Sequence, residues 1–265
     1  MNMYLHELKS LRKSTIIWTC AMIALAVIYF SLYPGIVNDA ADFKKLIGAY
    51  PASVRAAMGI SIGNITSILG FYSMVFSFIT LCGAIQAMNL GVSIISKESR
   101  ERTADFLLVK PVSRAAIVSA KLVAALTMLL ATNVIYYVAA SILANLVKTS
   151  DYSYRVFFMI NLTLFFIQLI FMAIGVVVSV FFTKLKSVLP ISLGTVFGFF
   201  IVGALIATGK NDEIRLISPF KYFDISYIIK NSSYEVTYLI AGIVIVAVSI
   251  ATSYFIYTKK DIHAV

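Results

Sequence analysis

The stretch KESRERTADFLLVKPVSR, residues 97–114, is a dense block of charge between two long uncharged segments. Residues 56–96 before it and residues 122–146 after it contain no Asp, Glu, Lys or Arg. Charged side chains are costly in hydrocarbon, whereas a helix of about 20 apolar residues can cross a bilayer. The block therefore lies in water at one end of two membrane crossings. A compact charged loop in that position suits docking to a soluble partner.

The whole chain has the composition of a membrane protein. Of its 265 residues, 60% are hydrophobic and 13% are charged, and the charged share is low for a soluble domain. The apolar runs are continuous and of helix length, unlike the alternating strands of a membrane barrel. We predict an all-α integral membrane protein with a single domain, residues 1–265. Its six spans are expected at about 14–34, 65–96, 113–147, 156–183, 187–208 and 236–258.

The basic residues predict the orientation of these spans. With both termini on the inner side, 13 of the 22 Lys and Arg residues fall on inner segments, against 5 of the 12 Asp and Glu residues. Cytoplasmic loops carry an excess of Lys and Arg, so both termini are expected in the cytoplasm. The formal net charge of +10 then reflects membrane topology and gives no reason to expect a nucleic-acid partner.

Two segments outside the spans have apolar residues at helical spacing. Near the N-terminus, Tyr4, Leu5, Leu8 and Leu11 fall on one side, and His6, Glu7, Lys9, Arg12 and Lys13 fall largely on the other. This spacing predicts an amphipathic helix that lies in the inner membrane interface, with its cations near lipid headgroups. A simple basic flank that orients the first span is the alternative. Residues 39–50 repeat the pattern and predict a surface-lying helix on the outer side.

The charged block contains its own helix boundaries. Residues 98–109 are plausible helix formers, Pro111 breaks the run, and Ser113 is a fitting N-cap for the next helix. The pattern predicts a short helix followed by a sharp turn into the third span.

The other large connection, residues 211–235, is too apolar for a free loop, although charges such as Arg215 and Lys221 interrupt it. Lipid does not tolerate irregular backbone unless protein shields it. The segment therefore predicts a short re-entrant or interfacial helix pair.

Motifs that would give the chain its own chemistry are missing from the sequence. The nearest approach to a phosphate-binding Walker loop is Gly203…Gly209-Lys210-Asn211, which has one residue too many between the glycines. It also has Asn where Ser or Thr should meet magnesium. No metal-binding cluster or catalytic triad is visible, so we assign no catalytic residue and no metal ligand. The energy for any transport is therefore expected from outside this chain.

Polar and small residues within the spans predict helix contacts. The polar candidates are Gln86, Asn89, Asn133, Asn161 and Gln168. Such side chains more often join helices by hydrogen bonds than bind a substrate. Gly194 and Gly198 form a G-x-x-x-G spacing that permits close helix approach, either within one subunit or between two.

The charged block resembles a known family. Glu98, Thr103, Leu107-Leu108, Pro111-Val112-Ser113-Arg114 and Lys121 are similar to the E-x-x-x-x-T-x-x-x-L-L-x-x-P-V-S-R-x-x-x-x-x-x-K signature of ABC exporter permeases of the type-2 class. Residues 216–224, LISPFKYFD, are similar to the outer segment before the last span in prokaryotic members. The order of spans matches over essentially the whole chain. Arg102 departs from the pattern, because many relatives have glycine before the threonine.

The resemblance implies a set of partners. Two permease subunits, as a homodimer or a heterodimer, would pack with two separate ATP-binding subunits, which would hold the ATP and magnesium. This chain itself would bind no cofactor. The charged segment would act as a coupling helix seated in a cleft of the ATPase, and the N-terminal helix would brace that contact. The first and fifth spans would face the partner permease, and the segment before the last span would close the pathway outside.

Three sets of residues would carry these roles. The coupling residues are Glu98, Arg100, Glu101, Arg102, Thr103, Phe106, Leu107, Lys110, Pro111 and Arg114. The bracing residues of the inner interfacial helix are Leu5, Leu8, Lys9, Leu11 and Arg12, and the outer gate residues are Pro219, Phe220, Tyr222 and Phe223. Charged members would form ion pairs at the rim of the contact, and Phe106 with Leu107 would anchor it in an apolar pocket.

We therefore expect a non-enzymatic permease subunit of an ATP-driven exporter in a bacterial-type plasma membrane. A hydrophobic or amphipathic cargo, such as a peptide, an antibiotic or a lipid, suits the residue types of the spans. One rival hypothesis is a stand-alone channel or secondary transporter, which would work without an ATPase. Another is a membrane-embedded enzyme, which would need clustered polar catalytic groups that the sequence does not contain.

Overall fold

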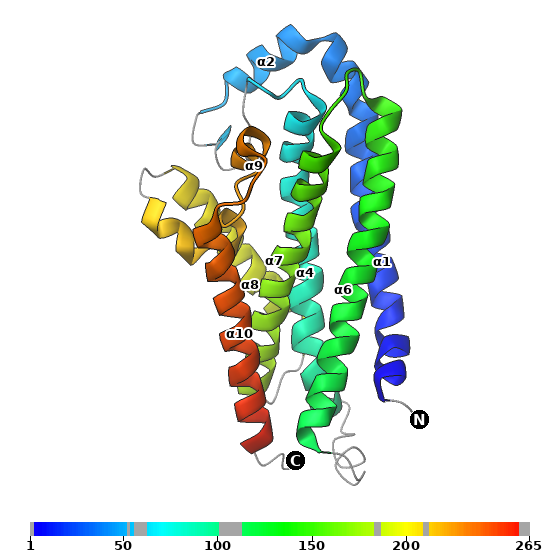
Figure 1. The fold of residues 1–265 in the computed structure, drawn as a ribbon, viewed down its shortest axis with the longest axis vertical. Coiled ribbons are helices and arrows are strands. Elements are labelled where there is room, and N and C mark those ends of the chain that lie inside the picture. The colour runs from blue at the N-terminus through cyan, green and yellow to red at the C-terminus, as the bar shows by residue number, and fades with distance from the viewer. Residues whose placement is uncertain are drawn as a thin grey trace.

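The computed structural model describes residues 3–51, 54–55, 63–100, 113–182, 187–208 and 212–259, and it shows a bundle of long helices (Figure 1). Six of the described helices are long and apolar enough to cross a membrane. They are α1 (Met3–Asn38), α4 (Ile68–Arg100), α6 (Arg114–Val147), α7 (Tyr154–Phe181), α8 (Leu189–Thr208) and α10 (Val236–Lys259). Their positions confirm the six predicted spans and the all-α membrane fold.

Short helices lie between some of the spans. They are α2 (Ala40–Gly48), the 3-10 helices η1 (Asp212–Ile217) and η2 (Pro219–Lys221), and α9 (Ile225–Asn231). Residues 39–50 are thus largely helical, as predicted. Before α10 the structure has three short helices instead of the predicted pair. Pro219 begins one of them, and Asp224 caps another, because its Oδ1 accepts the backbone N–H of Ser226 at 2.8 Å.

The first residues of α1 and the last residues of α10 lie at the same end of the bundle, together with the end of α4 and the start of α6 (Figure 1). The helices α2 and α9 lie at the opposite end. An even number of crossings places both ends of a chain on one side of the membrane. We name these two ends the inner end and the outer end, after the orientation that the basic residues predict.

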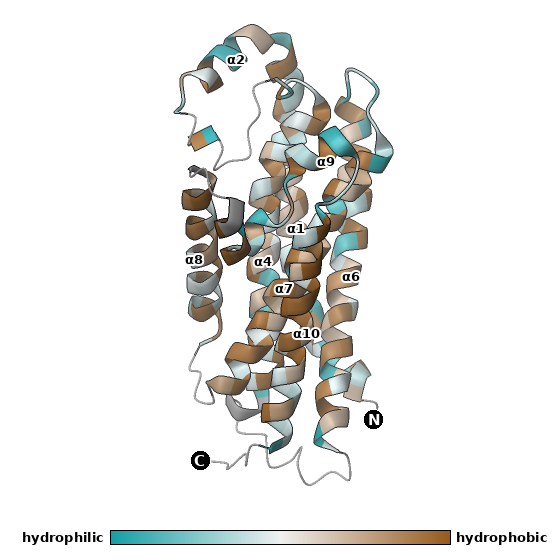
Figure 2. Cartoon of the chain, turned by 60° about the vertical axis from the view of Figure 1, so that its left-hand side comes forward, coloured by the Kyte–Doolittle hydropathy of each residue, from teal (hydrophilic) through white to brown (hydrophobic). Residues whose placement is uncertain are grey.

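The helices α4 and α7 form the centre of the bundle and are the most buried of the described spans. Two glycines allow their backbones to touch. A Cβ atom on Gly175 would lie 2.7 Å from the Met88 carbonyl oxygen, and one on Gly91 would overlap the Met172 carbonyl oxygen. The spans α1, α8 and α10 are far less buried. Figure 2 shows hydrophobic residues along α7, α8 and α10 and hydrophilic residues in α2.

A chain of polar side chains joins four of the spans at membrane depth. Gln86 of α4 donates from Nε2 to Thr132 Oγ1 of α6 at 3.0 Å. Gln168 of α7 donates from Nε2 to Gln86 Oε1 at 3.1 Å, and its own Oε1 accepts Asn133 Nδ2 at 2.6 Å. Thr19 of α1 donates to Thr132 at 3.2 Å. The prediction that Gln86, Asn133 and Gln168 join helices is confirmed.

The N-terminal segment is helical, as predicted, but it is continuous with the first span. Residues 3–14 form the first turns of α1, which runs from Met3 to Asn38. Leu5 is exposed, whereas Glu7 and Leu11 are buried against the bundle. Burial of a carboxylate requires a partner, and Lys121 of α6 supplies it. The side of the segment that meets the protein therefore carries an ion pair as well as apolar residues.

Candidate functional site

The charged block that the sequence marks for docking starts on α4 and ends at α6. The helix α4 continues through Glu98 and Arg100, and α6 begins at Arg114. The other predicted coupling residues, Glu101, Arg102, Thr103, Phe106, Leu107, Lys110 and Pro111, lie outside the described residues. Their contact with an ATPase stays a prediction, and the structure describes the two helices that flank them.

The start of α6 is fixed by a cap and by α10. Ser113 is the predicted N-cap, and its Oγ accepts a backbone N–H of the first turn at 3.2 Å. Arg114 donates from Nη1 to the Thr258 carbonyl oxygen near the end of α10, at 3.5 Å. One turn further along, the hydroxyls of Ser119 and Tyr254 lie 2.7 Å apart. The end of the charged block is therefore attached to the last span.

A buried ion pair joins the first helix to the third span. Lys121 Nζ donates to Glu7 Oε1 at 3.2 Å and to the Ile94 carbonyl oxygen of α4 at 2.6 Å. The two side chains are 1% and 5% exposed. The 13 basic and 5 acidic residues assigned to inner segments from the sequence include Lys121 and Glu7. Both are buried in the protein, so their assignment to a water-exposed segment is wrong. The available signal was that Lys121 falls inside the predicted third span, where a cation needs a partner.

Two further contacts hold the first turns of α1 in place. Lys97 Nζ of α4 donates to Ser10 Oγ at 2.6 Å, and the hydroxyls of Tyr4 and Thr127 lie 3.1 Å apart. Among the five predicted bracing residues, Leu11 is buried, Leu8 is half-buried, and Leu5, Lys9 and Arg12 are exposed. The segment is thus fastened to the bundle by polar groups, which helical periodicity does not predict, as well as by the apolar packing of Leu11 and Leu8.

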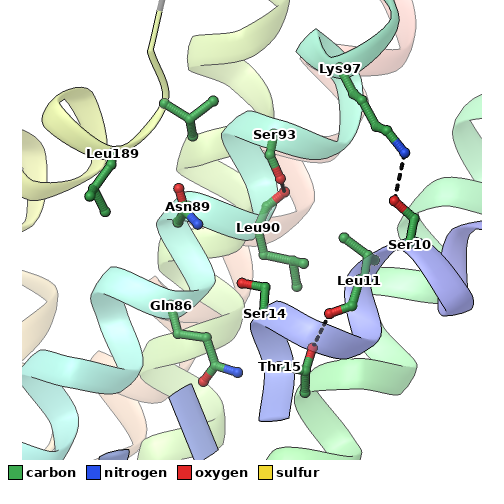
Figure 3. Close-up of a pocket in the computed structure, with 11 residues that line it drawn as sticks. Ser10, Leu11, Ser14, Thr15, Gln86, Asn89, Leu90, Ser93, Lys97 and Leu189 are labelled. Carbon is green, nitrogen blue, oxygen red and sulfur yellow. Dashed lines mark hydrogen bonds between the residues drawn. The ribbon is translucent and has the colours of Figure 1, made fainter. Parts of the chain in front are cut away.

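A cavity of about 370 Å³ lies between α1, α4 and the start of α8 (Figure 3). We name it the inner cavity. The helix α4 contributes Asn89, Ser93 and Lys97 to its wall, α1 contributes Ser10 and Ser14, and much of the remainder is apolar. Sequence reasoning grouped Asn89 with the amides that join helices. In the structure Asn89 faces the cavity and has no hydrogen-bond partner among the described residues.

At the outer end, residues 212–235 pack onto the spans, and we name them the outer element. Of the four predicted gate residues, Pro219, Tyr222 and Phe223 are buried and Phe220 is half-buried. The Phe220 ring lies 5.0 Å from that of Phe171 in α7, centroid to centroid. Aromatic pairs at such distances stabilise packing beyond their buried area. The gate residues are therefore anchored in the bundle, whereas a gating movement stays a prediction.

An arginine clamp closes the outer element. Arg215 donates from Nη2 to Glu235 Oε1 at 2.9 Å and from Nη1 to Oε2 at 3.1 Å, and it also bonds the Lys221 carbonyl oxygen. Its guanidinium lies 4.2 Å from the centre of the Tyr238 ring. Burial alone would lower the pKa of Arg215, but its bonds to Glu235 raise that pKa above the ordinary value. Neither the clamp nor the partner Glu235 was predicted, because the two residues are far apart in the sequence.

The charged form of Lys221, in the same element, is disfavoured by its surroundings. Burial lowers its pKa below the ordinary value, and the nearby Arg215 lowers it further, while Asp224 acts in the opposite direction.

Within the described ranges, no three His, Cys, Asp or Glu side chains come together to hold a metal ion. The geometry therefore offers a cavity, braced helix ends and a clamped outer element.

Comparison with known proteins gives one result. A family model described as ABC-2 family transporter protein matches residues 1–262. A search of curated proteins found no match.

Proposed function

Because the chain belongs to the ABC-2 family of transporter proteins, we propose that it is the permease subunit of an ATP-driven exporter. The family comprises membrane components of ABC transporters, and six apolar helices make this chain a multi-pass membrane protein. Separate partner subunits would bind ATP and magnesium and hydrolyse the nucleotide, so this chain would be non-catalytic. The observation that carries the proposal is the family match over residues 1–262.

In this role, residues 98–114 would dock into the ATPase and pass its movement to the spans. The contacts around the docking segment support such transmission. Lys97, at its start, bonds Ser10 of α1, and Arg114, at its end, bonds the last turn of α10. A movement of the segment would therefore reach α1 and α10 as well as α4 and α6. Packed elements pass on displacements of this kind because they shift as units.

A second permease subunit, identical or related, would complete the transporter. The glycines of the fifth span support this part of the proposal. A Cβ atom added at Gly194 or at Gly198 would meet nothing within 4 Å, so neither glycine serves close packing within the described chain. The spacing suits contact with another helix in the membrane. We place the partner permease against α8 and α1.

The remaining parts of the proposal concern location and cargo. The chain would lie in the cell membrane with both termini in the cytoplasm, as the distribution of Lys and Arg favours. The outer element would close the pathway at the opposite side. The mixed polar and apolar wall of the inner cavity supports an amphipathic or hydrophobic cargo.

The test uses the tagged chain purified in mild detergent from its native membranes and reconstituted in vesicles. We expect an ATPase with a Walker motif to copurify and to hydrolyse ATP in a transport-coupled manner. Replacing Glu98, Arg102 or Phe106 by Ala should lower this coupled activity about tenfold or more, because few residues dominate such contacts. The control is Lys45→Ala, which removes an exposed cation of α2 at the outer end.

Two results would contradict the proposal. One is cargo movement by the purified chain without any ATPase, which would favour a channel or secondary transporter. The other is full coupled activity in all three docking variants, with normal membrane insertion. In that case the charged block would only flank the spans.

A further inference from the structure

The helix α4 places a stripe of polar residues along the inner cavity. Gln86, Asn89, Ser93 and Lys97 follow one another at spacings of three or four residues, so they share one face of the helix. This face is polar in a span that is otherwise strongly apolar. Polar side chains in a membrane span usually face the protein interior or a water-filled cavity. Here most of the stripe borders the inner cavity (Figure 3).

The polar groups of the cavity wall fall into two classes. Some are already satisfied: Gln86 bonds both Thr132 and Gln168, and Ser93 donates to a carbonyl of its own helix at 3.2 Å. Ser14 and Asn89, by contrast, have no hydrogen-bond partner within the described ranges. Both line the inner cavity (Figure 3). These two side chains are available to a ligand.

The charge of the cavity wall determines which ligands the cavity favours. Among the described residues that line the cavity, Lys97 is the one charged side chain, and none of them is a carboxylate. Its Nζ donates to the neutral hydroxyl of Ser10 at 2.6 Å, so two of its three N–H groups remain for another acceptor. An ammonium group without a carboxylate partner attracts anions and repels cations.

The rest of the wall is apolar and includes Leu11, Leu90, Val188 and Leu189. Leu189 is 46% exposed, so the apolar wall of the cavity continues onto the exposed side of the bundle. A volume of about 370 Å³ is at the small end of ligand sites and holds a headgroup with the start of a tail. The wall therefore matches a molecule with a polar end and an apolar end.

We propose that the inner cavity binds the anionic headgroup of an amphiphile, a phosphate or a carboxylate, with Lys97 as its counter-charge. Ser14 and Asn89 donate hydrogen bonds to the headgroup oxygens, and the leucines of α1, α4 and α8 contact the first part of the tail. This inference deepens the proposed function. Binding of the amphiphile does not depend on that function, and only its identification as the cargo rests on it.

The experiment measures binding to the permease alone. The full chain in neutral detergent micelles is titrated with dodecyl phosphate, and fluorescence of Trp18 reports occupancy. Trp18 is the only tryptophan of the chain and lies one turn beyond Ser14 on α1. We expect saturable binding that Lys97→Gln weakens about tenfold and Lys97→Arg largely keeps, because a charge-assisted hydrogen bond is lost in the first variant only. Ser14→Ala combined with Asn89→Ala should weaken binding severalfold.

The matched control is Lys13→Gln, which removes an exposed cation of α1 that does not line the cavity and should bind like the wild type. Dodecyl trimethylammonium, with the same tail and the opposite charge, should not bind saturably. Equal affinity of Lys97→Gln and the wild type, or equal binding of the cationic amphiphile, would overturn the proposal. If inorganic phosphate binds as tightly as dodecyl phosphate, the tail contributes nothing to binding. The site would then take a free anion, and the proposal of an amphiphile would be wrong. No ATPase is present, so these outcomes are independent of the coupling test.

Discussion

Glu7 and Lys121 are 114 positions apart in the chain, yet the lysine ammonium donates to the glutamate carboxylate at 3.2 Å inside the protein. The second carboxylate oxygen of Glu7 has no hydrogen-bond partner in the part of the chain that the structure describes. A buried pair gains attraction from its low-dielectric surroundings but loses the hydration of both ions. We expect its main effect to be specificity, the selection of one rotation of the first turns of α1 against α4 and α6.

Breaking this pair on one side should be more harmful than removing both charges. Glu7→Gln or Lys121→Met leaves one buried ion without its partner, and we expect each to lower the free energy of unfolding by about 3–5 kcal/mol. The double variant Glu7→Gln with Lys121→Met should recover most of that loss. Thermal unfolding in detergent, arranged as a double-mutant cycle, measures the coupling. Strictly additive losses would show that the two groups do not interact.

The contact between α4 and α7 should be intolerant of a single added methyl group. Gly91→Ala places a Cβ atom against the Met172 carbonyl oxygen, so we expect a loss of about 1–3 kcal/mol in stability. Gly35→Ala in α1 is the matched control, because its Cβ would meet nothing within 4 Å. That change should stabilise by about 0.5–1 kcal/mol, since alanine favours helix more than glycine does. Equal melting temperatures for the two variants would refute the close backbone approach.

Large side chains at Gly194 and Gly198 of α8 should weaken dimer assembly and leave the folding of the single chain intact. Gly194→Leu combined with Gly198→Leu meets open space within the subunit, so the melting of the monomer should change little. If α8 faces a second permease, the same change should lower the dimer fraction about tenfold or more, measured by light scattering of the detergent-purified protein. Ala251→Leu on the exposed face of α10 is the control. An unchanged dimer in the glycine variant would place the interface elsewhere.

The arginine clamp of the outer element should depend on geometry as well as on charge. Arg215→Lys keeps the cation but loses the bidentate bond to Glu235 and the bonds to the Lys221 carbonyl oxygen. We expect it to loosen the outer element nearly as much as Arg215→Ala, because lysine cannot reproduce the planar fork. Hydrogen exchange of residues 212–235 measures the effect. Wild-type protection in Arg215→Lys would mean that charge alone suffices.

Lys221 should give a pH-dependent gain when its charge is removed. Its pKa is lower in the folded protein than in the unfolded chain, so the charged form is disfavoured by folding. The penalty is fully present below the folded-state pKa, falls as the pH rises through that pKa, and is gone above the higher pKa of the unfolded chain. Lys221→Met should therefore raise the melting temperature at neutral pH, with a smaller gain at alkaline pH. A gain that does not vary with pH would point to packing as its source.

The sequence predicts those parts of the structure that depend on local chemistry. Long uncharged runs define the six spans, and Ser113 is recognisable as a cap because it follows Pro111 and precedes a long helix. The burial of Glu7 is different, because it depends on Lys121, a residue far away in the chain. Local periodicity grouped Glu7 with the exposed cations around it for that reason.

Gln86 and Asn89 show the same limit at the candidate site. Both are amides on the same face of α4, and both line the inner cavity. Only Gln86 lies within hydrogen-bonding distance of Thr132 and Gln168, and this difference depends on how the neighbouring helices pack. The arginine clamp escaped prediction in a similar way, since Arg215 meets Glu235 only after the intervening short helices have packed.

The unbroken course of α1 has a mechanical consequence. A helix of 36 residues is about 54 Å long, which exceeds the hydrocarbon thickness of a bilayer. Pro34 lies in the last turns of this helix, where its missing N–H removes a backbone hydrogen bond and favours a kink. The stiff part of α1 therefore ends before Pro34, and α2 follows the helix after a single intervening residue. A tilt imposed at the inner end of α1 would displace its far end, and Pro34 would decide how much of that displacement reaches α2.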